Sequence, residues 1–254
     1  MARSFASASS QYLTNGNAVL TATPLTLAAW FKATDLTNQQ VLISLNDNLT
    51  SGFTGAYDLR INGGSSGSVR AIVYDGATPG IADTTVTASS GAWTHAAAVF
   101  ASNSAQAAYV NGGNGVTNGA TSNPTGIVRT DVGTRATLAG LFANCTIAEA
   151  AVWNVALTVA EIAALAAGVS PRRLRPGNLK AHWPLFGLTA PEPDLAGGGF
   201  NLTLSGGPTQ ANHAPVTLLT PPWRGEVEPA VVAGSVRPRP PLVALPPFSP
   251  SWFD

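Results

Sequence analysis

The thirteen carboxylic acids of this 254-residue chain are the side chains best suited to acid–base catalysis. Glycoside hydrolysis uses two carboxyl groups that flank the scissile bond, and two acids spaced two residues apart on a strand share one face. Two pairs have this spacing, Glu192/Asp194 and Glu226/Glu228. Both pairs stand next to prolines and outside the regular strand pattern described below, so we predict that the protein is not an enzyme.

The three histidines and the single cysteine form no recognisable metal or nucleophile motif. His95, His182 and His213 are far apart, and none belongs to a His-x-x-x-His pair. Cys145 has no second cysteine in the chain with which it could form a disulfide. We predict that Cys145 is a buried structural thiol and that His95 is a satisfied framework residue.

Acidic residues in turns could offer the hard oxygen ligands that calcium prefers. The candidates are Asp47 with Asn46 and Asn48, Asp75 at a hairpin end, and Asp131. The backbone geometry of turns explains Asp and Asn at these positions equally well. We therefore predict no cofactor, with calcium as the alternative.

These candidates are embedded in short strands that turns separate. Apolar side chains alternate with other residues over 25–32, where Trp30 and Lys32 share one face, and again over 57–61 and 69–73. Asn-Gly, Asp-Gly and Gly-Gly pairs between such runs are typical of antiparallel hairpins. No helical period separates the runs, so the pattern excludes an α/β fold and predicts an all-β antiparallel sandwich.

One short helix is expected after the first set of strands. Thr158 can cap its N-terminus, and Glu161 three residues later completes a capping box. Ile162 and Leu165 share one face, and Gly168 suits the position after the last turn. We expect the helix to lie over one end of the sandwich.

Strand patterns return late in the chain, ahead of a proline-rich segment. Residues 178–185 and 200–204 read as strands, but two strands bury too little to stand alone. We therefore predict one body over residues 1–206, which the late strands 178–204 complete. Residues 207–254 hold 11 of the 19 prolines and are predicted to form an extended C-terminal arm.

This arm differs from an ordinary polar linker because it carries large apolar side chains. Leu245, Phe248, Trp252 and Phe253 require a surface to cover them. We predict that these four residues anchor the protein to an assembly, through other proteins or through copies of itself.

Charge and hydropathy exclude two classes of partner. Thirteen basic and thirteen acidic residues give a formal net charge of zero, unlike the positive field of a nucleic-acid-binding protein. No stretch approaches the ~18–20 consecutive apolar residues of a membrane-spanning helix. The opening residues, Met-Ala-Arg-Ser-Phe-Ala, lack the apolar run of a signal peptide, so we expect no cleaved leader.

Three segments in a fixed order carry a family resemblance. They are Trp93 to Phe100, then Ala108 to Gly112 with its Asn-Gly turn, and then Ile147 to Ile162. This order resembles a laminin-G-like domain of the concanavalin-A-like jelly-roll type, over about residues 3–168. Residues 179–204 resemble the opening strands of such modules in a permuted position. The resemblance implies a jelly roll in which Trp93, Tyr109 and Trp153 are framework residues.

The resemblance leaves two functions open, because this fold hosts both lectins and interaction modules. The Gly/Ala/Thr-rich composition and the late Trp-Pro-Leu segment also resemble those of bacteriophage structural proteins. The first hypothesis is a virion structural protein for capsid decoration or the tail, made in the host bacterial cytoplasm and held by its arm. The alternative is a lectin-like adhesion module, extracellular or on a cell surface, that binds glycans through Tyr57, Tyr74 and Asn111.

Overall fold

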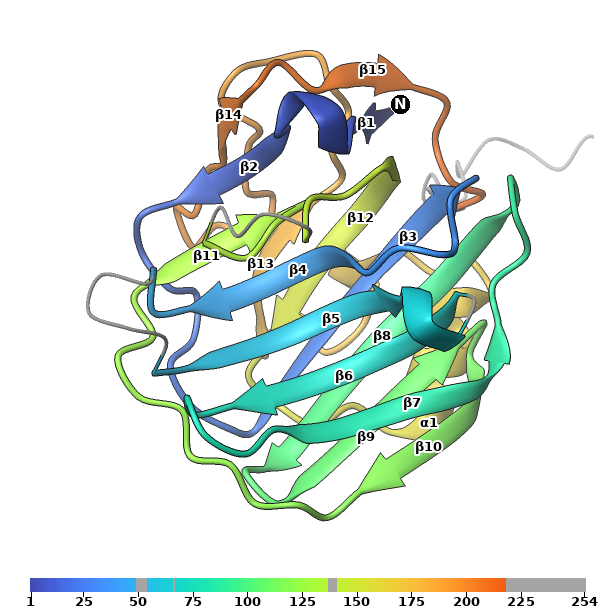
Figure 1. Ribbon diagram of the computed structural model, residues 1–254. Helices are drawn as coiled ribbons and strands as arrows, with labels where there is room; N and C mark the ends of the chain where they lie inside the picture. Colours follow the sequence, from blue (N-terminus) through green and yellow to red (C-terminus); the bar gives the residue numbers. More distant parts are fainter. Residues whose placement is uncertain (49–53, 66, 137–140, 218–254) are drawn as a thin grey trace, which may run out of the picture. The chain divides into compact units, whose positions relative to one another are not determined.

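Two antiparallel sheets face each other in the computed structural model (Figure 1), which describes residues 1–48, 54–65, 67–136 and 141–217. Sheet A runs in the order β10 (Gly113–Asn118), β9 (Ala105–Val110), β8 (Trp93–Ser102), β3 (Leu25–Ala33), β12 (Cys145–Trp153), β1 (Ala2–Ser4) and β15 (Thr209–Ala211), and β13 (Leu179–Trp183) also pairs with β12. Sheet B runs in the order β14 (Thr203–Ser205), β2 (Tyr12–Asn15), β11 (Arg129–Val132), β4 (Gln40–Asn46), β5 (Ala56–Asn62), β6 (Ser68–Tyr74) and β7 (Gly80–Thr87). The predicted all-β sandwich is confirmed.

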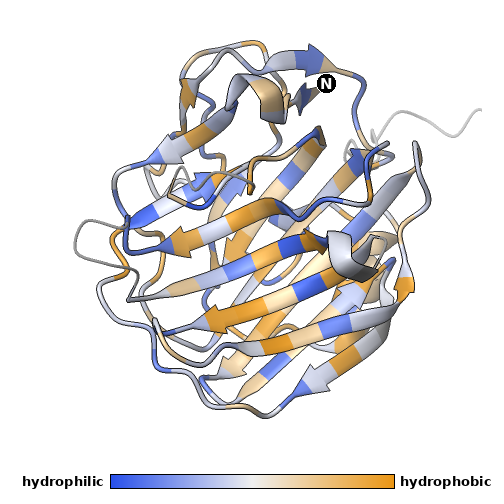
Figure 2. Ribbon diagram, in the orientation of Figure 1, coloured by the Kyte–Doolittle hydropathy of each residue, from blue (hydrophilic) through white to orange (hydrophobic). Residues whose placement is uncertain are grey.

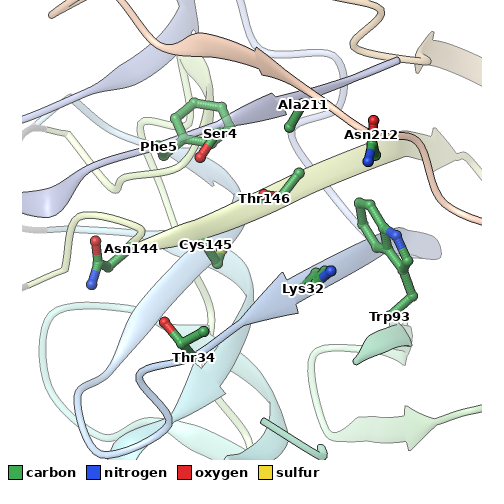
Figure 3. A pocket seen from close by; sticks show the side chains of 10 residues that line it. All are labelled: Ser4, Phe5, Lys32, Thr34, Trp93, Asn144, Cys145, Thr146, Ala211 and Asn212. Carbon is green, nitrogen blue, oxygen red and sulfur yellow. The ribbon is translucent and has the colours of Figure 1, made fainter. Parts of the chain in front are cut away.

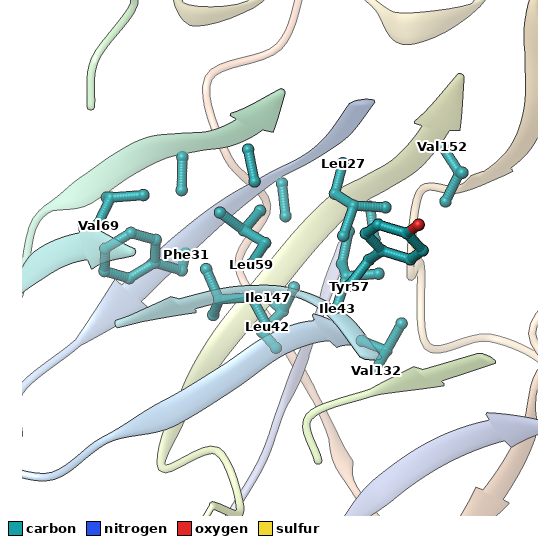
Figure 4. Close-up of a cluster of buried hydrophobic side chains, with 14 of the residues drawn as sticks. Leu27, Phe31, Leu42, Ile43, Tyr57, Leu59, Val69, Val132, Ile147 and Val152 are labelled. Atoms are coloured by element: carbon teal, nitrogen blue, oxygen red, sulfur yellow. The ribbon is translucent and has the colours of Figure 1, made fainter. Parts of the chain in front are cut away.

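The core lies between the two sheets and follows from the period of two along the strands. On β3, Leu25, Leu27 and Phe31 are fully buried in the central cluster, whereas Trp30 and Lys32 belong to the opposite face. Figure 2 shows the same alternation of apolar and polar residues along β5 of sheet B, and Figure 4 shows side chains of both sheets meeting in the core. Each large side chain buried here stabilises the fold by roughly 1.5–3 kcal/mol.

Helix α1 (Val159–Ala166) begins where the capping box predicted. The Thr158 hydroxyl accepts a hydrogen bond from the Glu161 amide at 3.3 Å, and the Glu161 carboxylate accepts one from the Thr158 amide at 2.8 Å. Ile162 and Leu165 are buried against the outer face of sheet A beside Trp153. None of the helices among the described residues is long and apolar enough to cross a membrane.

The Thr158→Ala substitution is expected to lower the free energy of unfolding by about 1 kcal/mol, because the Glu161 amide at the start of α1 loses the hydroxyl group that accepts its hydrogen bond. Urea unfolding followed by circular dichroism measures this loss. Thr158→Ser keeps the hydroxyl group and should retain nearly all of the stability. Equal stabilities for Thr158→Ala and the unchanged protein would show that the capping box is unimportant here.

The late strands complete both sheets, as predicted. β13 joins β12 in sheet A, and β14 joins β2 in sheet B. The predicted boundary at residue 206 is wrong, however, because β15 pairs with β1 and Val169 forms a bridge with Thr217. Residues 209–211, Thr-Gln-Ala, lack the apolar alternation that would have marked them as a strand. The body therefore includes residues 207–217.

The outer face of sheet A is covered unevenly. Helix α1 covers the part around Trp153, and Ala214 and Val216 pack over the part around Trp30. Lys32, near the end of β3, is exposed beyond both covers. This uncovered area contains the candidate site.

Candidate functional site

Four side chains lie in one row across the outer face of sheet A. Ser4 on β1 stands opposite Thr146 on β12, and Thr146 stands opposite Lys32 on β3. Lys32 in turn stands opposite Trp93, the first residue of β8. Opposed residues in an antiparallel pair project to the same face, so the four side chains form a continuous strip. With strands about 4.8 Å apart, the strip spans roughly 14 Å.

An open pocket of about 400 Å³ lies over this strip (Figure 3). Figure 3 shows Asn144 toward one end of the pocket and Trp93 and Asn212 toward the other. Its volume is within the range of small-molecule sites. Ten of the described residues line it: Ser4, Phe5, Lys32, Thr34, Trp93, Asn144, Cys145, Thr146, Ala211 and Asn212.

Trp93 contributes an aromatic surface to the pocket. It is half-buried because it packs against the buried cluster of Ala2, Trp30, Ala148 and Ala214, yet it still lines the pocket. An indole that is packed on one side is held rigidly and can offer an apolar surface to a ligand on the other. Trp93 therefore packs as the framework prediction expects, and part of it is also accessible from the pocket. The strand pattern could not show that this end of β8 lies outside the area covered by α1.

Lys32 is the one charged residue among the ten that line the pocket. Its side chain is exposed and forms no ion pair within the part of the chain that the structure describes. Three hydroxyl groups and two amide groups supply hydrogen-bond donors and acceptors around it. The pocket therefore combines one cation, several neutral polar groups and one aromatic surface.

A buried cluster of ionisable groups ties the segment around Asn212 to sheet A. Oε2 of Glu149 lies 2.8 Å from Nε2 of His182, and Oε1 of Glu149 lies 3.2 Å from Nε2 of His213. A bulge in β12 gives Glu149 a φ of +53°. Burial alone would raise the pKa of the Glu149 carboxyl, but the hydrogen bonds and charges of the two histidines lower it to about 2. No spacing rule in the sequence links these residues.

A second pocket of about 250 Å³ adjoins the first at Asn144. Its lining is Ser7, Ala8, Asp35, Asn38, Gln39, Gln40, Phe142 and Asn144. Asp35 accepts hydrogen bonds from the Asn38 side-chain amide at 2.8 Å and from the Thr37 backbone amide at 2.9 Å. These bonds, led by that of the Asn38 side chain, lower the pKa of Asp35 to about 2. The second pocket therefore carries a negative charge.

None of the three residues predicted to contact glycans lines either pocket. Tyr57 is 1% exposed and packs edge-on against Phe100 in the core, so that prediction is wrong. Asn111 is exposed, but its φ of +50° and its hydrogen bond with the His95 amide mark it as a turn residue. Tyr74 ends β6 in sheet B, whereas the pocket lies on sheet A.

The other framework predictions agree with the structure in most respects. Trp153 is fully buried, and its indole donates to the carbonyl oxygen of Leu174 at 3.0 Å. Cys145 is buried, which raises the pKa of its thiol, and Tyr109 is half-buried. His95 is 2% exposed, but its Nδ1 has no hydrogen-bond partner among the described residues, so it is not the satisfied residue we predicted.

The carboxylates considered for calcium make contacts within turns and strands. Asp47 accepts hydrogen bonds from Thr54, Asp75 accepts them from backbone amides, and Asp131 forms an ion pair with Arg129 at 2.7 Å. Within the described ranges, no three His, Cys, Asp or Glu side chains are arranged to hold a metal ion. These contacts agree with the interpretation of the acids as turn and framework residues.

The structure brings together two acids that sequence spacing does not relate. Asp58 on β5 and Asp131 on β11 both stand opposite Ser44 of β4, between them in sheet B. Asp58 is ion-paired with Arg60 and Arg135, and Asp131 is ion-paired as well. Because guanidinium groups hold both carboxylates, we interpret this row as a structural charge network.

Of the two acid pairs with strand spacing, the structure describes Glu192 and Asp194, whose carboxylates bind other groups of the fold. Glu192 lies 2.5 Å from the Arg3 guanidinium, and Asp194 accepts a hydrogen bond from the His182 amide. Glu226 and Glu228 lie outside the described residues, as do the proposed anchors Leu245, Phe248, Trp252 and Phe253. The anchoring role of the arm therefore stays a prediction.

Comparison with known proteins places this fold in a family. The model of the concanavalin A-like lectin/glucanase superfamily matches residues 7–163. The chain belongs to this superfamily. The match covers most of the region in which the laminin-G-like resemblance was noted, whereas no comparison supports a bacteriophage origin. A search of curated protein sequences finds no match to this concanavalin A-like chain.

Three solved structures are similar to this chain over more than half of its length. A putative carbohydrate binding protein from Bacteroides ovatus is 18% identical with a TM-score of 0.59, over 85% of this chain and 61% of that one. Domains LG4-5 of the mouse laminin alpha1 chain are 12% identical with a TM-score of 0.48, over 63% and 43% of the two chains. A heptameric SAP-like pentraxin from Limulus polyphemus is 16% identical with a TM-score of 0.48, over 61% and 75%. At 18% identity, the likeness to the Bacteroides ovatus protein concerns the fold.

Proposed function

We propose that this concanavalin A-like protein binds saccharides without hydrolysing them, and that it does so in the pocket over Lys32 and Trp93. The observation that carries the proposal is the strip of Ser4, Thr146, Lys32 and Trp93, which strand register holds on one open face. Rigid strands position these groups better than loops would.

The chemistry of the pocket suits a sugar. A sugar ring presents an apolar C–H face and a rim of hydroxyl groups, and the pocket offers an indole surface together with hydroxyl and amide groups. Hydrolysis would require two carboxyl groups near the bound ligand. None of the ten described residues that line the pocket is an acid, which supports binding without catalysis.

The comparisons support this proposal in general terms. The superfamily is named after lectins and glucanases, and the Bacteroides ovatus protein is described as a putative carbohydrate binding protein. The virion role depends on the arm beyond residue 217, and nothing in the described body favours it over saccharide binding.

The Trp93→Ala variant is expected to lose saccharide binding by a factor of about ten or more, because the aromatic surface of the pocket is removed. The measurement is a glycan array probed with the full chain, followed by calorimetric titration of the strongest ligand. Tyr109→Ala is the matched control, since Tyr109 is a half-buried aromatic residue outside the pocket.

Trp93 also packs against its neighbours, so a variant that leaves the packing intact is needed. Asn212→Ala changes an exposed amide of the pocket, and we expect it to weaken binding severalfold at unchanged stability. An array without hits for the unchanged protein, or a ligand that both variants bind normally, would contradict the proposed function.

A further inference from the structure

The charges of the two pockets indicate the class of saccharide. We infer that the ligand is an acidic oligosaccharide, with its carboxylate or sulfate against Lys32 in the first pocket and neutral units past Asn144 in the second. This inference rests on the proposed function and adds the charge and the direction of the ligand.

Lys32 lies in the middle of the strip, between Thr146 and Trp93. Its ammonium group is therefore within reach of a ligand that spans the strip. No acid lines this pocket, and Lys32 has no ion pair in the described part of the chain. An anionic group on the ligand would thus meet an ammonium group that no carboxylate of the pocket neutralises.

Asp35 gives the second pocket the opposite polarity. Its carboxylate is fixed by Thr37 and Asn38, and the side chains of Asn38 and Gln39 add amide groups to the pocket lining. Amide groups pair well with sugar hydroxyls, whereas a second anion there would meet a like charge.

The two pockets share Asn144, so a single ligand can occupy both. Volumes of about 400 and 250 Å³ on either side of Asn144 fit a chain of sugar units better than one unit. The opposite charges then fix its direction, with the acidic unit over Lys32 and the neutral units beside Asp35.

The test is a glycan array on which each oligosaccharide is present as its neutral, carboxylated and sulfated forms. We expect the full chain to bind acidic forms about tenfold more tightly than their neutral parents at low salt, and this margin should shrink as sodium chloride screens the charges. The carboxylated and sulfated forms identify which anion is preferred.

The variants separate this inference from the proposed function. Lys32→Gln should abolish the preference for acidic forms while binding of the neutral parents persists. Lys180→Gln is the matched control, because it removes the same charge from a lysine outside both pockets. Asp35→Asn should improve binding of oligosaccharides that carry a second anion.

Two further outcomes would be decisive. Neutral and acidic forms that bind equally well, or an acidic preference that survives Lys32→Gln, would overturn the inference and leave the proposed function standing. An array without hits would overturn the proposed function, and the inference with it.

Discussion

Replacing Trp183 with alanine is expected to lower the free energy of unfolding by about 3–5 kcal/mol. Trp183 comes from the late strand β13, is fully buried and belongs to the cluster between the two sheets. Its indole also donates a hydrogen bond of 2.6 Å to the carbonyl oxygen of Phe200. The substitution therefore opens a large cavity in the core and leaves a carbonyl group without its partner.

Chemical unfolding of the full chain, followed by fluorescence and circular dichroism, measures this loss. Lys180→Ala on the same strand is the control and should change stability by less than about 0.5 kcal/mol, because Lys180 is partly exposed. If β13 were an appendage rather than part of the core, Trp183→Ala would be as mild as this control, and our account of the late strands would fail.

Acidification is expected to destabilise the protein through His95. Burial lowers the pKa of His95 from 6.5 to about 3, so the native protein keeps this histidine neutral while the unfolded chain protonates it. Above pH 6.5 His95 is neutral in both the native and the unfolded protein, and it costs no stability. As the pH falls from 6.5 toward 3, the unfolded chain takes up a proton that the native protein does not, so the free energy of unfolding falls. By proton linkage, the free energy of unfolding should fall by about 2 kcal/mol between pH 6.5 and pH 4.5.

The measurement is the free energy of unfolding at several pH values for the unchanged protein and for His95→Leu, which cannot take up the proton. As the pH falls from 6.5 to 4.5, the unchanged protein should lose about 2 kcal/mol more of its unfolding free energy than His95→Leu does. This expectation does not depend on how much the substitution itself costs. Glu149 does not confound the comparison, since its depressed pKa acts below pH 4.5 and is common to both proteins. Parallel pH profiles would contradict a buried neutral His95.

The fold could be predicted largely from local patterns. The alternation in β3 and the capping box at Thr158 are short-range signals, and the structure confirms both. The end of the body could not be predicted, because β15 has three residues and becomes a strand only through its pairing with β1. Its stability comes from that long-range contact rather than from its own sequence.

The site was harder to predict because it depends on register between strands that are far apart in sequence. Ser4, Lys32, Trp93 and Thr146 come from four segments, and only their pairing brings them into one row. The alternation placed Lys32 and Trp30 on the same face, but the segment with Ala214 and Val216 packs over Trp30 and leaves Lys32 exposed. Tyr57 is the opposite case, because we predicted that it contacts a glycan whereas its side chain is buried in the core.

The most direct test of the saccharide site is a titration of the ¹⁵N-labelled full chain with the strongest array ligand, followed by NMR. The chain has six tryptophan indole groups, and we expect the indole resonance of Trp93 to shift together with the backbone amides of Lys32 and Thr146. The indole resonances of Trp153 and Trp183 should stay in place, since both rings are fully buried. Shifts confined to the face of sheet B around Asp58, or an unmoved Trp93 at saturation, would contradict our account.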